Sequence, residues 1–346
     1  MQDQVDAKVT LNRTTGRNRL IGLGALFLLL GAAIILGIAA GARPIPLSTT
    51  WDAITNFDPS NSDHLLVRLL RIPRTLLAIV VGAALGVSGT IMQALTRNPL
   101  SDPGILGINA GAAVAITCAI ALFGITSVTA YMALGMAGAA FAGAAVYLLG
   151  NLSRGGNPVR VVLAGAALSV VLMSLTQIVL VNSEEHVFDQ FRNWSVGSLQ
   201  GRGYGVLFPV LAVASLGIAI AFTLTKALDT AALGADLAKA LGGNPLRIWG
   251  LSALAVIILS GAATAGAGPI GFVGLTAPHI ARLITGPGHR WLLPYAMLIA
   301  ALLTVSADAL GRIIAPPGEV SVGIMLALIG GPFFIALVRH HRISKL

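Results

Sequence analysis

The run from Gly266 to Gly271 is where this sequence comes nearest to a known site for chemistry, because it matches the G-x-G-x-x-G pattern of dinucleotide-binding loops. That pattern needs a strand before it and an acidic residue about 20 positions after it. Here a long apolar stretch precedes the glycines, and no Asp or Glu follows before Asp308. Pro269 also opposes a regular helix start at the second glycine. The run therefore predicts a broken helix at the outer edge of a membrane, and no cofactor.

Side chains for metal or phosphate chemistry are equally scarce. The single cysteine, Cys118, rules out a disulfide framework and a cysteine-based metal centre. The six histidines show no H-E-x-x-H spacing, so no metal site is expected. The sequence has no G-x-x-x-x-G-K-[ST] loop. If ATP drives this protein, a separate subunit must bind the ATP and its magnesium.

Asp308 is the one carboxylate inside a predicted membrane span, and such acids often belong to proton relays. Arg312 follows at i+4, where the two side chains can form an ion pair. A paired acid near a helix end is typical of a structural role. Proton coupling stays open as the alternative.

Composition predicts the elements that carry these residues. Of 346 residues, 56% are hydrophobic, 10% are charged and 41 are glycine. Soluble domains have about 25% charged residues, so a soluble enzyme, a disordered chain and a coiled coil are excluded. A bilayer-crossing helix needs about 20 apolar residues. The sequence predicts an all-α integral membrane protein of about ten helices: 20–42, 75–96, two within 103–153 that reverse around 124–129, 161–183, 203–225, 248–267, 270–285, 291–310 and 320–338.

These spans leave little chain for anything else, so residues 1–346 are predicted to form a single transmembrane domain. With both termini inside, inner segments hold 15 Lys and Arg and outer segments hold 7, as the positive-inside rule requires. We therefore expect cytoplasmic tails at 1–19 and 339–346 and an inner loop at 226–247. Inner loops account for the net charge of +9, so no nucleic acid is expected. The run 20–42 is too long for a signal-peptide core and is expected to be retained.

Two polar segments could contact other proteins. Arg68, Arg71 and Arg74 are predicted to lie in an outer loop, where cations are disfavoured. They could anchor lipid head groups or dock an acidic protein surface. On the inner side, 230–241 is predicted to be one short helix that ends at Gly242 and contacts a partner or only connects two spans.

Several long strings are similar to one family, the permeases of iron-siderophore, haem and vitamin B12 ABC importers. They are RIPRTLLA from Arg71, MQALTRNPLSDPG from Met92, LGINAGA from Leu106, GPIGFVGL from Gly268 and PHIAR from Pro278. The resemblance covers about residues 20–340. It implies ten helices per subunit, a second permease subunit that is identical or related, two ATP-binding cassette subunits inside and a substrate-binding protein outside.

The resemblance also implies residue roles. Arg71, Arg74 and Arg312 match outer arginines that pair with acids of the binding protein. Asn98 and Leu100 match an inner gate, and Pro158 and Val159 align with a second gate, where small hydroxyl residues stand in the vitamin B12 member. Because of that departure, the resemblance does not decide whether Pro158 and Val159 act as a gate. The segment matching the ATPase-coupling helices contains Thr230, Leu233, Gly234, Ala235, Ala238, Leu241 and Gly242.

The substrate implied is a ferric siderophore. The string FDQFRNWSVGSL from Phe188 is most similar to ferric-enterobactin-type permeases. Haem and vitamin B12 stay open as alternatives by the same machinery. The expected mechanism is ATP-driven alternating access in a bacterial inner membrane, with no bond chemistry in this chain. A proton- or sodium-coupled secondary transporter is the alternative from another class, and Asp308 would have to be its coupling acid.

Overall fold

The computed structural model describes residues 2–41, 43–150 and 158–340, and these residues form helices and connecting turns without strands. Met1, Ala42, residues 151–157 and residues 341–346 lie outside the described part, and with them the ends of both predicted tails. Ten helices match the ten predicted spans: α1 (Gln2–Ala39), α4 (Ile72–Thr96), α5 (Ile108–Phe123), α6 (Val128–Leu149), α7 (Pro158–Val181), α9 (Tyr204–Thr223), α12 (Pro245–Ala267), α13 (Val273–Thr285), α14 (His289–Ile314) and α15 (Val322–His340).

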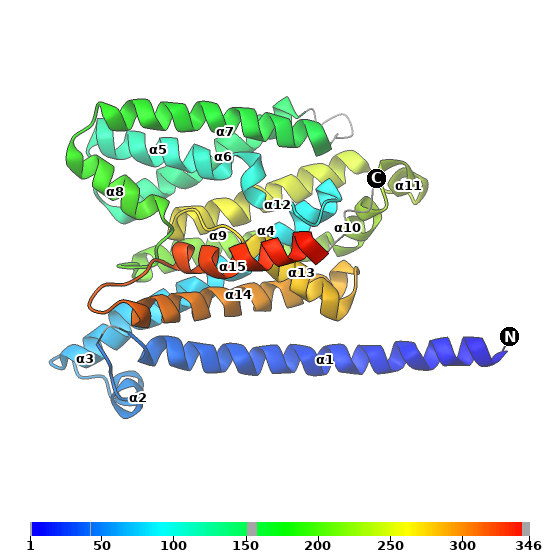
Figure 1. The fold of residues 1–346 in the computed structure, drawn as a ribbon, viewed down its shortest axis with the longest axis horizontal. Helices are drawn as coiled ribbons and strands as arrows, with labels where there is room; N and C mark the ends of the chain where they lie inside the picture. The colour runs from blue at the N-terminus through cyan, green and yellow to red at the C-terminus, as the bar shows by residue number, and fades with distance from the viewer. Residues whose placement is uncertain (1, 42, 151–157, 341–346) are drawn as a thin grey trace.

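Short helices connect these spans. Two ends of the bundle can be distinguished in Figure 1. At the end where α1 begins and α15 ends lie α10 (Thr225–Ala232) and α11 (Ala235–Ala240). We call this the α10–α11 end. At the opposite end, called the α8 end, lie α2 (Leu47–Thr55), α3 (Ser62–Leu65) and α8 (Glu185–Ser195).

Helix α4 is the centre of the packing and contacts α14, α12, α9 and α13. Small residues permit this. A Cβ built on Gly82 would lie 2.6 Å from the carbonyl oxygen of Ala300, and one built on Gly86 would lie 2.5 Å from that of Ala296. Only glycine lets α4 and α14 approach so closely, which is how transmembrane helices associate where lipid supplies no hydrophobic drive.

The helix break predicted at the glycine-rich run is confirmed. Helix α12 ends at Ala267, Gly268 has φ +79°, and α13 begins only at Val273. Phe272, just before α13, also has positive φ. With 13 residues, α13 rises only about 20 Å, less than the roughly 30 Å hydrocarbon thickness. The run therefore ends one helix and starts a short one.

The predicted outer loop at Arg68–Arg74 is wrong. The chain is helical from Ser62, through a π-helical turn η1 (Leu66–Arg71), to Thr96. The sequence argument ended the span at the charged residues because it had no partners for them. In the structure these charges lie within the helix, and two of them, Arg71 and Arg74, are buried.

Candidate functional site

An ion-pair cluster lies near the α8 end, between α4 and α14. Arg74 donates from Nη2 and Nε to Oδ1 of Asp308 at 2.8 and 3.0 Å. Nη2 of Arg312 lies 3.0 Å from Oδ2 of the same carboxylate. The predicted Asp308–Arg312 pair is thus confirmed, and Arg74 adds a second cation from 234 residues away in sequence.

Glu319 completes this cluster. Nη1 of Arg74 donates to Oε2 of Glu319 at 2.7 Å, so one guanidinium holds an acid from α14 and an acid from the segment before α15. Sequence analysis did not single out Glu319. The available signal was weak: an acid just outside a span, separated from Arg312 by Pro316 and Pro317, which interrupt a helix.

Arg71 has a different set of partners, the carbonyl groups at the end of α1. It donates from Nη1 to the carbonyls of Ile38 and Ala39 at 3.0 and 2.6 Å, and from Nη2 to that of Arg43. Arg312 adds a bond to the carbonyl of Ala40 at 3.1 Å. The last carbonyls of a helix have no partner within it and carry negative partial charge. The two arginines therefore cap α1.

Arg71, Arg74 and Arg312 are consequently internal, with exposed fractions of 6%, 9% and 2%. A direct docking role requires charge that a partner protein can reach, and the structure instead engages all three within the chain. Arg43, Arg68 and Arg192 are the exposed cations that the structure describes at this end. Arg68 lies over the ring of Phe57, 4.6 Å from its centroid. Docking through the three buried arginines stays a prediction.

The predicted coupling helix at 230–241 is divided into two. Helix α10 contains Thr230 and is anchored by the fully buried Leu228. Gly234 then takes φ +103° and ψ 160°, a conformation open essentially to glycine alone, so α10 cannot continue into α11. Ala235 begins α11, but its side chain lies outside the described part. Gly242 follows α11 with φ +80°.

The coupling segment presents leucines. Leu233, Leu237 and Leu241, at i, i+4 and i+8, are 55%, 55% and 63% exposed. Ala238, predicted to lie on the ATPase contact, is instead only 2% exposed. The amide of Gly243 donates to its carbonyl at 2.8 Å. Ala238 is therefore buried within the permease itself.

The same loop is tied to α14 by a contact that sequence analysis missed. Oδ1 of Asp229 lies 2.6 Å from Nδ1 of His289 and accepts the backbone N–H of the same residue at 2.9 Å. The sequence patterns assigned neither residue a role in binding or contact. Their spacing of 60 residues gave no signal.

The first predicted gate lies in the turn after α4, at the α10–α11 end. Arg97 has φ +52° and ends α4. Asn98 and Leu100 are exposed, and Oδ1 of Asn98 accepts the N–H of Leu100 at 2.9 Å. Asp102 follows, and burial raises the pKa of its carboxyl although the N–H of Gly104 bonds to it at 2.8 Å.

The second predicted gate, Pro158 and Val159, forms the first turn of α7. Val159 is 62% exposed, and the side chain of Pro158 is outside the described part. The 3₁₀ turn η2 (Pro103–Leu106), which follows the first gate, packs on α7. This contact lies at Gly165 of α7, against Ile105 and Leu106 of η2.

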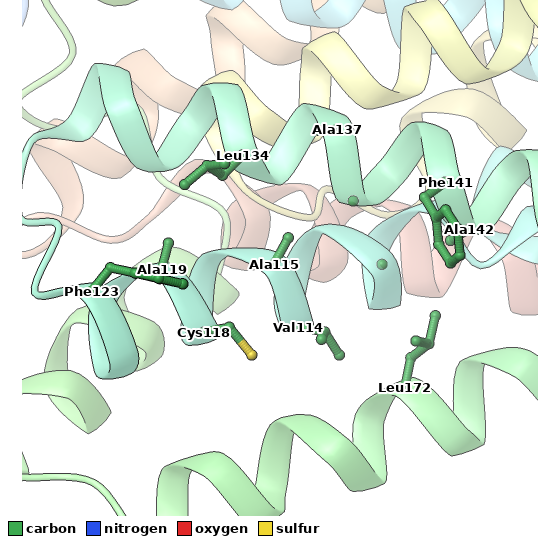
Figure 2. A pocket seen from close by; sticks show the side chains of 12 residues that line it. Val114, Ala115, Cys118, Ala119, Phe123, Leu134, Ala137, Phe141, Ala142 and Leu172 are labelled. Atoms are coloured by element: carbon green, nitrogen blue, oxygen red, sulfur yellow. The ribbon is translucent and has the colours of Figure 1, made fainter.

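An open apolar cavity of about 440 Å³ lies between helices α5, α6 and α7. Figure 2 shows Val114 and Cys118 of α5 pointing toward Leu172 of α7. No charged side chain lines it, so it has no group that could orient a polar ligand. Among the residues that the structure describes, no three His, Cys, Asp or Glu side chains are grouped to hold a metal ion.

Comparison with known proteins agrees with this architecture. Residues 28–340 match the FecCD transport family. The chain is 44% identical to the ferric enterobactin transport system permease protein FepD of Escherichia coli (strain K12), over 93% of this chain and 96% of FepD. It is 39% identical to the probable siderophore transport system permease protein YfiZ of Bacillus subtilis (strain 168), over 92% and 96%.

A solved structure gives the same result for the fold. It is described as an inward-facing conformation of a metal-chelate type ABC transporter, and it superposes with a TM-score of 0.82 at 29% identity, over 92% of this chain and 99% of that one. The expected fold and the expected transport role are thereby confirmed. The chain belongs to the FecCD transport family: it is a multi-pass membrane permease of an ABC transporter complex, and not itself an enzyme.

Proposed function

We propose that this permease carries a ferric siderophore into the cytoplasm, powered by two ATP-binding cassette subunits and supplied by an extracytoplasmic binding protein. The single observation that supports the cargo best is the 44% identity to the ferric enterobactin permease along nearly the whole chain. The absence of charged groups from the α5–α7 cavity suits a chain that passes a chelated ion rather than binding a bare one.

The alternatives of the same class are haem and vitamin B12. The alternative of another class, ion-coupled transport, would need Asp308 to exchange a proton or sodium ion. Asp308 is 1% exposed and lies between Arg74 and Arg312. Both oxygens of this carboxylate are already engaged by arginines of the chain itself, which favours ATP as the energy source.

The ATPase contact is proposed at the α10–α11 end, which is the cytoplasmic end. The observation that supports this contact is the set of three exposed leucines, Leu233, Leu237 and Leu241. Apolar side chains exposed to water on a cytoplasmic loop favour burial against a partner. Thr230, Gly234, Ala238 and Gly242 shape this segment.

Docking of the binding protein is proposed at the α8 end. Arg68, Arg43 and Arg192 are exposed cations that an acidic surface can reach, although Arg43 already pairs with Asp63 at 3.0 Å and Arg192 with Asp189 at 3.1 Å. Arg71, Arg74 and Arg312 contribute by fixing α1, α4 and α14 beneath that surface. The cytoplasmic exit is proposed to form where two permease subunits face each other. It is closed by Asn98, Leu100, Pro158 and Val159.

The test is uptake by proteoliposomes that contain the permease, its ATPase and its binding protein. Ferric enterobactin, haem and vitamin B12 are supplied separately outside the sealed vesicles. The vesicles either contain ATP or carry a proton gradient across their membrane. We expect uptake of the ferric siderophore that requires both ATP and the binding protein. Uptake driven by the gradient without ATP would refute the ABC mechanism, and preferential uptake of haem or vitamin B12 would refute the cargo.

A further inference from the structure

Asp229 and His289 form a bridge between the coupling loop and a membrane span. Asp229 lies in α10, one residue before the segment proposed to contact the ATPase, and its side chain is 44% exposed. His289 is the first residue of α14 and is 3% exposed. Oδ1 of Asp229 lies 2.6 Å from Nδ1 of the ring and accepts the backbone N–H of His289 at 2.9 Å.

This geometry ties α10 to α14 in two ways. A carboxylate accepts, so the imidazole donates from Nδ1. The backbone bond satisfies one of the N–H groups that a helix start leaves unpaired, and a negative charge there is favoured by the helix dipole. The other ring nitrogen, Nε2, is buried and has no hydrogen-bond partner among the described residues. Asp229 is therefore the polar group that fixes the ring.

Helix α14 extends from this bridge toward the other end of the bundle. It has 26 residues, which corresponds to a length of about 39 Å. Near its far end, Asp308 is held by Arg74 and Arg312. Between the two ends, Ala296 and Ala300 lie directly against Gly86 and Gly82 of α4. A displacement of the α14 start therefore acts on a closely packed helix pair whose far end carries the buried ion pairs.

We infer that Asp229 and His289 are positioning residues that transmit the movement of the ATPase-bound coupling loop to α14 and so to the outer side. This inference rests on the proposed ABC mechanism, and it adds a specific route that neither the family match nor the relatives assign. The pair touches no cargo and no nucleotide. It acts by making α10 and the start of α14 move as one body.

The test measures how strongly the loaded binding protein stimulates ATP hydrolysis by the complex in nanodiscs. The variants are His289→Ala, Asp229→Ala and the double variant. We expect each single variant to lower the stimulated-to-unstimulated ratio at least about threefold, and the double variant to be no worse than Asp229→Ala, because residues of one pair are not additive. His289→Gln, whose amide can still donate to Asp229, should restore part of the ratio.

Arg290→Ala is the matched control. Arg290 is the next residue, is exposed, and should leave the ratio unchanged. Co-purified ATPase per permease and the melting temperature of each variant separate coupling from folding. Unchanged ratios in assembled His289→Ala and Asp229→Ala complexes would overturn the inference, as would losses that multiply in the double variant. If the alanine variants fail to assemble, His289→Phe replaces them, because its ring fills the same space but cannot donate to Asp229. A stimulated-to-unstimulated ratio in His289→Phe equal to that of wild type would then overturn the inference.

The wild-type complex separates this inference from the proposed function. If the wild type binds no ATPase or shows no stimulation, the proposed function fails. The bridge is then tested in the permease alone, by measuring the mobility of a spin label attached to Leu237→Cys in a Cys118→Ala background. We expect His289→Ala to increase the mobility of this label and Arg290→Ala to leave it unchanged. Equal mobility in both would contradict the bridge.

Discussion

Arg74 shows what a single buried side chain does in this permease. Its guanidinium bonds to Asp308 at 2.8 Å and to Glu319 at 2.7 Å, so it neutralises two acids from different segments. Arg312 shares the first of these acids and also caps α1. Charges taken out of water are tolerated only when they are paired and hydrogen-bonded. The cluster therefore holds α1, α4, α14 and the segment before α15 together.

Arg74→Ala should destabilise the permease strongly. It leaves Glu319 without its cation and Asp308 with only one, and breaking a buried pair costs about 3–5 kcal/mol. The melting temperature in nanodiscs should fall well below that of Arg68→Ala, an exposed arginine earlier in the same helical stretch, whose ring contact is worth about 0.5–1 kcal/mol. Equal melting temperatures would contradict a stabilising role for the cluster.

Burial of Arg71 and Arg74 also limits what charge reversal can test. Arg71→Glu combined with Arg74→Glu would report on docking only if both arginines lay on the surface. In the structure, the reversal would place new carboxylates beside Asp308, Glu319 and the terminal carbonyls of α1 that Arg71 caps. Loss of folding would then obscure docking. Arg68→Glu is the cleaner substitution, because Arg68 is exposed.

At the scale of elements, hydropathy predicted most helices but not their polar ends. The reversal expected at 124–129 lies between α5 and α6, and 270–285 became α13 with a start delayed by Gly268 and Phe272. The span 75–96 began too late because arginines within a helix look like a loop until their partners are known. The acids that pair with Arg74 are 234 and 245 residues away, and the carbonyls that bind Arg71 are 28 to 33 residues away, beyond any local pattern. Likewise the φ of Gly234 that divides the coupling segment is fixed by the surrounding fold.

For the coupling segment, we predict opposite outcomes for two adjacent substitutions. Leu237→Asp puts a charge on an exposed leucine and should weaken ATPase association at least tenfold, ~1.4 kcal/mol, with the permease melting temperature unchanged. Ala238→Asp buries a charge within the loop itself and should lower the melting temperature of the permease alone. Co-purification and thermal unfolding measure both. ATPase binding that survives Leu237→Asp would remove the leucines from the contact.

For the turn after α4, Leu100→Gly should make the transporter waste ATP. Removing an exposed side chain from the exit widens it, while the Asn98 bond to the backbone of residue 100 can persist. We expect more ATP hydrolysed per siderophore delivered in proteoliposomes, with Leu100→Ile close to wild type. An unchanged ratio in Leu100→Gly would count against a gate here.

At the scale of the whole molecule, function depends on which end faces the cytoplasm. The α10–α11 end carries the coupling segment, both gate segments and the Asp229–His289 bridge, whereas the α8 end carries the ion-pair cluster. Energy and cargo would thus enter at opposite ends. The closely packed pair of α4 and α14 extends between these ends.

This arrangement makes a direct prediction about orientation. Cys118 is the only cysteine, so a Cys118→Ala background accepts single reporters: Gln200→Cys for the α8 end and Leu241→Cys for the α10–α11 end, both at exposed positions. A membrane-impermeant maleimide added to intact spheroplasts should label Gln200→Cys and should reach Leu241→Cys only after permeabilisation. The positive-inside rule requires this orientation, because Lys and Arg concentrate on the segments at the α10–α11 end. The reverse pattern of labelling would place the leucines outside the cell, where no ATPase could reach them, and the proposed coupling would fail with it.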